Sequence, residues 1–130
     1  MKPTAINPES LARPRGYSHG MKGAGEVLFV AGQIGWNREG HMVSDDLAVQ
    51  FGQALDNVVD VVWAAGGTAE SIARLTIYVT DKQEYRRRAK DLGEAYRKRM
   101  GKHFPAMSLV EVKSLLEDDA KVEVEATALL

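Results

Sequence analysis

Apolar and polar residues alternate along three stretches of the chain, which is the pattern of β-strands that bury one face. The stretches are residues 71–80, 108–112 and 121–130. In the last of them one face carries Val122, Val124, Ala126 and Ala128, and the other carries Lys121, Glu123, Glu125 and Thr127. The alternation therefore predicts strands whose apolar faces lie against a common core.

Residues 27–34 are apolar at nearly every position and predict a strand that is buried on both faces. A shorter stretch precedes Gly23 and Gly25, and we expect the two strands to form a hairpin through these glycines. Residues 1–16 contain proline and polar residues without a period, which predicts an extended lead-in.

Apolar residues at helical spacing predict two helices between these strands. Ser44 is the expected N-cap of the first helix, which ends before Gly66 and Gly67. Its apolar stripe consists of Leu47, Phe51, Leu55, Val58, Val59 and Val62. The second helix is expected to start at Asp81, with Glu84 in a capping-box position, and to continue without a break to Met100.

The predicted order of elements is β-β-α-β-α-β-β, which is typical of an α+β sandwich with one mixed sheet and two helices on one of its faces. The length of 130 residues fits a single domain, residues 1–130. The face without helices is expected to carry Arg74, Thr76, Tyr78, Glu111, Glu123 and Glu125. An uncovered face of this mixed kind favours packing against another subunit.

Composition and charge argue against several classes of function. The chain has 17 basic and 18 acidic residues and a net charge of −1, so no overall positive field favours a nucleic-acid partner. It contains no cysteine, which removes thiolate catalysis and disulfides. We see no secretory signal and no apolar run long enough to span a bilayer, and we expect a cytoplasmic protein without a membrane partner.

Some residues are candidates for chemistry by their type and position alone. Glu123 and Glu125 share a strand face, where a carboxylate pair can act as acid and base or can simply form the polar face. His103 is the best-placed histidine for acid–base work, but the three histidines lack metal-ligand spacing, so we expect no metal site. The basic run Arg86–Lys90 has acidic neighbours at helical spacing, which favours a self-paired, solvated helix face.

Four phrases of the sequence occur in the order and spacing of a known family. They are RGYSHGMKGAGEVLFVAGQIG, QFGQALDNVVDVVWAAGGTAESIARLTIYVTD, FPAMSLVEV and VEVEATALL. Together they lie within residues 14–130, and the chain resembles the RidA/YjgF family, also called the Rid family. The resemblance implies a chorismate-mutase-like sandwich, a homotrimer whose sheets pack into a central barrel, and small-molecule sites in the clefts between subunits.

The best-known activity of the Rid family is the hydrolysis of reactive imines and enamines to a keto acid and ammonia, and it uses no metal or organic cofactor. Glu125 matches the glutamate that activates the attacking water, and Tyr17 matches the pocket tyrosine, to which we assign orientation of the substrate nitrogen. Gly32 and Gln33 match the Gly-Gln pair of the family, and the backbone near Ala106 is expected to bind a substrate oxygen.

The chain departs from the family at three pocket positions, where Rid deaminases have arginine, usually serine, and asparagine. Here these positions hold Met107, Ala31 and Gly93. The arginine of the family grips the substrate carboxylate with its planar fork, and losing such a buried pair costs about 2–5 kcal/mol. Met107 makes the cleft more apolar, so we expect poor activity on small 2-imino acids.

Two functions of different classes stay open. One is a Rid-type deaminase that hydrolyses a reactive imine or enamine other than a small 2-imino acid. The other is a non-catalytic trimer that binds small molecules in the same clefts. Glu125 and Tyr17 favour the enzyme, whereas the lost polar positions favour the binder. Endoribonuclease activity, reported for some relatives, is the least favoured because the net charge is near neutral and no aromatic stacking platform is visible.

Overall fold

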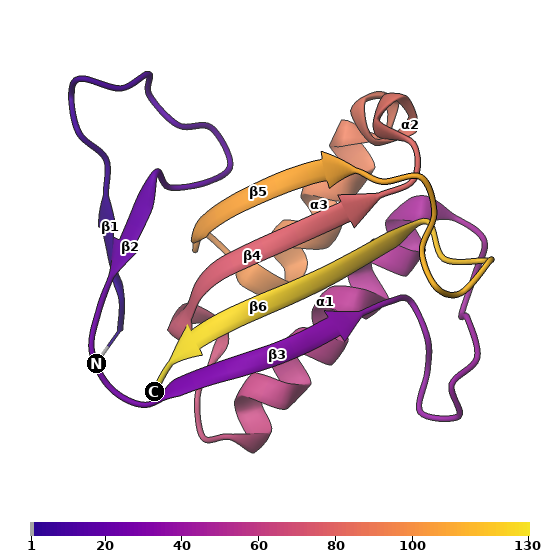
Figure 1. Ribbon diagram of the computed structural model, residues 1–130, viewed down its shortest axis with the longest axis horizontal. Coiled ribbons are helices and arrows are strands. Elements are labelled where there is room, and N and C mark those ends of the chain that lie inside the picture. Colours follow the sequence, from indigo (N-terminus) through magenta and orange to yellow (C-terminus); the bar gives the residue numbers. More distant parts are fainter. Residues whose placement is uncertain (1) are drawn as a thin grey trace.

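The computed structural model describes residues 2–130, and its centre is a four-stranded mixed sheet (Figure 1). Across the sheet the strands follow the order β3 (Val27–Gln33), β6 (Val122–Leu129), β4 (Ile72–Val79) and β5 (Ala106–Glu111). Strands β4 and β5 are parallel, and the other two pairings are antiparallel. The predicted α+β class with one mixed sheet is confirmed.

The helices gather on one face of the sheet. Helices α1 (Leu47–Ala64) and α3 (Ala89–Met100) lie behind the sheet in Figure 1, and the short α2 (Lys82–Arg87) precedes α3. A 3₁₀ turn, η1 (Ala69–Ser71), leads into β4. No helix within residues 2–130 combines the length and the apolarity needed to cross a membrane.

The core lies between the sheet and the helices, where the predicted periods place it. The predicted inner face of β6 is buried, namely Val122, Val124, Ala126 and Ala128. The stripe of α1 that meets this face includes Phe51, Leu55, Val58 and Val62, each at most 1% exposed. The period-2 and period-3.6 patterns therefore meet along one interface, which confirms the predicted sandwich.

The predicted open face needs one correction. Arg74, Thr76 and Tyr78 of β4 share it with Glu123 and Glu125 of β6, as expected. The prediction for Glu111 is wrong, because the parallel register pairs it with the buried Val79 and so directs it to the helix side. There its carboxylate accepts a hydrogen bond from the backbone N–H of Lys82 at 2.9 Å.

The predicted hairpin between the strand before Gly23 and β3 is also wrong. Strand β2 (Gly20–Lys22) pairs with β1 (Thr4–Ile6), a strand inside the expected lead-in, to form a ribbon that stands away from the sheet (Figure 1). The first residue of the lead-in lies outside the described residues.

The physical reason for the missing hairpin is an anchor just before β2. The Ser18 N–H donates to the carbonyl of Pro105 at 3.1 Å, and its hydroxyl donates to the carbonyl of Phe104 at 2.6 Å. These contacts hold the chain at the β5 edge of the sheet, opposite to β3. The outer edge of β3 consequently pairs with no other strand among residues 2–130.

The helix boundaries differ from the prediction at two polar residues. The N-cap of α1 is Asp46 rather than Ser44, because the Asp46 carboxylate accepts the Val49 N–H at 3.1 Å. Ser44 supports the cap instead, since its hydroxyl accepts the Asp46 N–H at 3.0 Å. The expected single helix to Met100 is divided at Arg88, whose φ of −98° and ψ of 19° separate α2 from α3.

Arg88 also changes the predicted pairing of the basic run. Its guanidinium donates to Asp46 at 2.8 Å, across to the start of α1, and to Asp91 at 3.0 Å. Within residues 2–130, Arg88 is the only member of the run Arg86–Lys90 in an ion pair. A tertiary ion pair and an i,i+3 pair therefore stand where i,i+4 pairs were expected.

We expect Asp46→Ala to lower the free energy of unfolding by about 1–2 kcal/mol at neutral pH, mostly through the lost N-cap, because a half-exposed ion pair adds little. The hydrogen bond from Arg88 and then that from the Val49 N–H hold the pKa of Asp46 below its ordinary value. This contribution is present above the unfolded pKa of about 4 and disappears as the pH falls through the lower folded pKa.

Urea unfolding at neutral and at acidic pH tests this prediction. Asp45→Ala is the matched control, because Asp45 is the exposed neighbour and no ion pair joins it to another described residue. An equal loss of stability in both variants would rule out the cap and the Arg88 pair as the cause.

Candidate functional site

The predicted site residues separate into two groups at opposite edges of the sheet. Ala31, Gly32 and Gln33 lie on β3, which forms one edge. Ala106 and Met107 open β5, which forms the other edge. Two strands, β6 and β4, lie between these edges, so one chain does not bring the two groups together.

Tyr17 belongs to the group at the β5 edge. Its neighbour Ser18 forms a parallel bridge with Ala106 and is anchored to Phe104 and Pro105, as described above. The Tyr17 ring packs edge-on against the His19 ring, with the ring centroids 5.3 Å apart. The FPAM turn therefore positions Tyr17 beside the start of β5.

Met107 faces the helices and lines a pocket. The register pairs it with the buried Leu75, so its side chain lies on the helix side, where it packs against the core. The pocket has a volume of about 350 Å³. Its lining residues are Gly16, Phe51, Ile77, Tyr85, Ala89, Leu92, Gly93, Tyr96, Arg97, Phe104 and Met107. The structure thus brings together Met107 and Gly93, two of the three positions at which a departure from the family was expected.

Glu125 lies on the open face of the sheet and has a fixed partner. The Tyr78 hydroxyl donates to Glu125 Oε1 at 2.6 Å, between neighbouring strands β4 and β6. This hydrogen bond raises the pKa of Tyr78, and burial and the charges of Glu125 and Glu123 add to the shift. One carboxylate oxygen of Glu125 is therefore occupied by a neutral phenol, and the carboxylate is held in one orientation.

Glu123 and Gly32 are in close contact on the same face. A Cβ atom added to Gly32 would overlap the Glu123 carboxylate, so a larger residue at this position of β3 would displace that side chain. The ladder between β3 and β6 is irregular between Val30 and Gln33, where the Gln33 side-chain amide donates to the Ala31 carbonyl at 3.2 Å. The Gly-Gln pair therefore lies beside the acidic face rather than beside Met107.

Met107 and Glu125 point to opposite faces of one sheet. Glu125 pairs in register with Thr76, and Met107 pairs with Leu75, the adjacent residue of β4. Because side chains alternate along a strand, these two cannot converge on one small ligand within a single chain. A site that uses both residues requires a second copy of the chain.

Two of the three histidine rings lie within hydrogen-bond distance of backbone carbonyls. Nε2 of His103 lies 2.7 Å from the Ile72 carbonyl, and Nε2 of His19 lies 2.6 Å from the Ala12 carbonyl. A carbonyl only accepts, so these nitrogens carry the proton. The acid–base role considered for His103 finds no substrate-facing geometry. Residues 2–130 contain no cluster of three or more His, Cys, Asp or Glu side chains placed to hold a metal.

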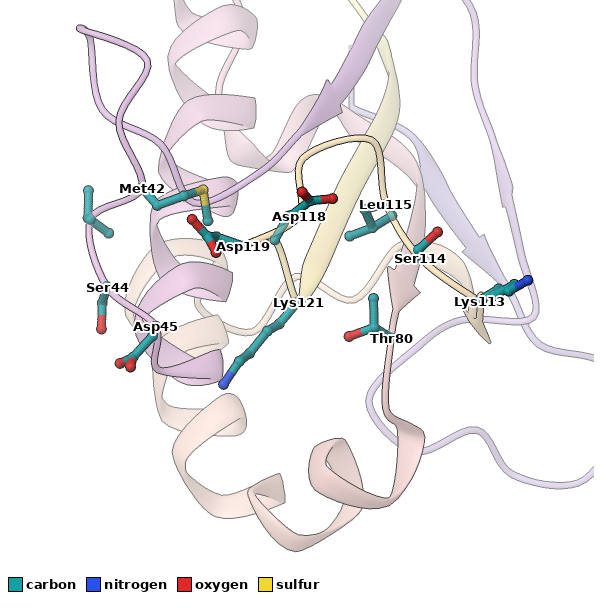
Figure 2. A pocket seen from close by; sticks show the side chains of 12 residues that line it. Met42, Ser44, Asp45, Thr80, Lys113, Ser114, Leu115, Asp118, Asp119 and Lys121 are labelled. Atoms are coloured by element: carbon teal, nitrogen blue, oxygen red, sulfur yellow. The ribbon is translucent and has the colours of Figure 1, made fainter.

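A further pocket, of about 610 Å³, lies among the loops that follow β3, β4 and β5 (Figure 2). Gln50, which is fully buried, joins the loops after β3 and β5: its amide donates to the carbonyls of Ser44 and Asp119 at 3.0 Å, and its oxygen accepts the Lys121 N–H at 2.8 Å. The pocket contains none of the predicted site residues. Sequence reasoning missed it because it depends on three separate loops.

Comparisons with known proteins agree with this fold. The family described as Endoribonuclease L-PSP matches residues 8–130. A 2-iminobutanoate/2-iminopropanoate deaminase of Escherichia coli K12 is 36% identical over 105 residues, covering 81% of this chain and 80% of its own. A RutC family protein of Pyrococcus horikoshii is 34% identical over 122 residues, covering 92% of both chains.

Solved structures show the same similarity. A conserved Rid family protein from Yersinia pestis, YyfB, has a TM-score of 0.89 and 32% identity, with both chains covered completely. The E. coli protein TdcF with bound serine has a TM-score of 0.70 and 29% identity, over 99% of this chain and 93% of its own. The chain belongs to the Endoribonuclease L-PSP family, which is the RidA/YjgF or Rid family.

We expect the pKa of Tyr78 to fall toward the ordinary tyrosine value of about 10 in Glu125→Gln, because the carboxylate that stabilises the protonated phenol is removed. Ultraviolet titration of each protein against its own Tyr78→Phe counterpart isolates this one tyrosine. Glu117→Gln, an exposed loop substitution, is expected to leave the titration unchanged. An unchanged titration in Glu125→Gln would contradict the Tyr78–Glu125 hydrogen bond.

Proposed function

We propose that this protein hydrolyses a reactive imine or enamine metabolite to a carbonyl compound and ammonia. The observation that carries the proposal is Glu125, a carboxylate held by Tyr78 on the open face at the position that matches the water-activating glutamate of the Rid family. The similarity to a deaminase over 81% of the chain supports the same reaction class.

The proposed site forms between two copies of the chain. Tyr17, Ala106 and Met107 lie at the β5 edge, whereas Gly32 and Gln33 lie at the β3 edge. Packing the β5 edge of one copy against the β3 edge of the next would unite the two groups and cover the open face. This arrangement supports the expected homotrimer with ligand sites in its clefts.

In the proposed reaction, Glu125 accepts a proton from a water molecule as the water oxygen attacks the C=N carbon, and Tyr17 orients the substrate nitrogen. Glu125 returns this proton to the nitrogen, which gives a neutral carbinolamine. The hydroxyl proton of the carbinolamine then passes through Glu125 to the same nitrogen, so that the C=O bond forms as the C–N bond breaks and ammonia leaves. The net change is one imine and one water to one carbonyl and one ammonia, without a redox step. Tyr78 contributes by fixing the orientation of Glu125.

The substrate is expected to differ from small 2-imino acids. Met107 lies among apolar and aromatic side chains and provides no donor for a carboxylate. The same observation supports the alternative function, a trimer that binds a small molecule without turning it over. Ala31 and Gly93 also lack the polar groups of the family at their positions.

We expect the wild-type protein to accelerate ammonia release from 2-iminopropionate, generated in situ by an amino-acid oxidase, only slightly above spontaneous hydrolysis. Met107→Arg is expected to raise this rate by tens- to a thousand-fold, because it restores a guanidinium for the substrate carboxylate. Adding Glu125→Gln to Met107→Arg should abolish the gain, and adding Glu117→Gln should not.

Other outcomes decide between the functions. Rapid hydrolysis of 2-iminopropionate by the wild-type protein would show that the missing arginine does not matter and that another group holds the carboxylate. Silence of both the wild type and Met107→Arg would favour the non-catalytic binder. A gain that survives Glu125→Gln would remove Glu125 from the reaction.

A further inference from the structure

The pocket beside Met107 has the size and lining of a small-molecule site. Its volume of about 350 Å³ falls within the range of known ligand pockets, about 300–1,000 Å³. Its walls are mostly aromatic and aliphatic, and the rings of Tyr96 and Phe104 stack with centroids 5.4 Å apart. Met107 adds an adaptable, polarisable surface. The pocket therefore suits an apolar body.

The interior of the pocket is poorly solvated. Burial raises the pKa of both Tyr85 and Tyr96, two of the lining residues. The Tyr96 hydroxyl is already used, since it donates to the His103 carbonyl at 2.7 Å. A charged group would be costly inside, so any charge on a ligand belongs at the rim.

Arg97 supplies a cation among the lining residues. It stands one turn after Gly93 on α3, and its guanidinium lies over Gly93, with Nη1 3.1 Å from where a Cβ of residue 93 would be. Within residues 2–130 Arg97 takes part in no ion pair, whereas Arg88 and Arg99 each pair with an aspartate at 2.8 Å. The guanidinium is exposed and available to an anion.

We infer that this pocket binds a monocarboxylic acid with a large apolar or aromatic body, whose carboxylate pairs with Arg97 at the rim while the body packs on Met107. Met107 and Gly93 then act together in binding this acid. Met107 contacts the apolar body, and the absence of a side chain at Gly93 lets Arg97 lie across the helix. That this ligand is the substrate rests on the proposed function, whereas the binding site does not.

The test is calorimetric titration of the intact protein with phenylpropanoate, an unreactive acid of this class. We expect saturable binding of one molecule per chain. Phenylpropanamide, which has the same body without the charge, should bind about tenfold more weakly or worse, because the charged contact is absent. Acetate, which has the charge without the body, should show no saturation at the same concentrations.

Two variants test whether Arg97 is the residue that pairs with the carboxylate of the ligand. Arg97→Gln should weaken phenylpropanoate by about tenfold or more and leave phenylpropanamide unchanged. Lys98→Gln is the matched control, because it removes an adjacent, exposed positive charge of the same helix that does not line the pocket. Circular dichroism of both variants checks that the fold is kept.

Three results would overturn the inference. Absence of phenylpropanoate binding to the wild-type protein would mean that the pocket is closed to ligands, as it would be if a second copy filled it. Equal binding of acid and amide, or equal effects of Arg97→Gln and Lys98→Gln, would remove Arg97 from recognition. Saturable binding of phenylpropanoate, with no imine hydrolysis by either the wild type or Met107→Arg, would instead count against the proposed reaction and leave the binding site in place.

Discussion

The arrangement depends on strand β6, which lies between β3 and β4 and has two opposite faces. Its valines and alanines are buried against the helices, while Glu123 and Glu125 stand on the other face. A slip of one residue would exchange these faces and bury the carboxylates, which is very costly without partners. The burial of one face therefore fixes the position of the acidic groups on the other.

Strand β6 and its neighbours separate the acidic groups from the apolar pocket. The carboxylates and Tyr78 lie on the open face, and the apolar pocket with Met107 and Arg97 lies on the helix side. Neither half makes a complete site for an imine within one chain. The family to which the chain belongs includes imine deaminases, and a second copy packed edge to edge is the arrangement that would join the two halves.

The site inferred around Arg97 would recognise an acid differently from the arginine expected of Rid deaminases at position 107. An arginine at position 107 would place a positive charge in the lining of this pocket. With Met107 in the lining and Arg97 beside Gly93, the cation lies on an exposed residue and most of the lining is apolar. Hydrophobic burial would then contribute most of the binding energy, and the cation would set the orientation.

The sequence by itself determined most strands and helices of the sandwich, their apolar faces and the family, because these depend on local periodicity and on short motifs. It did not determine which strands pair. The β2–β3 hairpin failed because Ser18 is anchored at the far edge of the sheet, and the second helix is interrupted at Arg88, whose side chain pairs with Asp46. Only the tertiary structure decided which face of the sheet Glu111 occupies, that the site residues lie at two edges, and the role inferred for Arg97. The face of Glu111 depends on the register of neighbouring strands, and the other two depend on contacts between residues far apart in the chain.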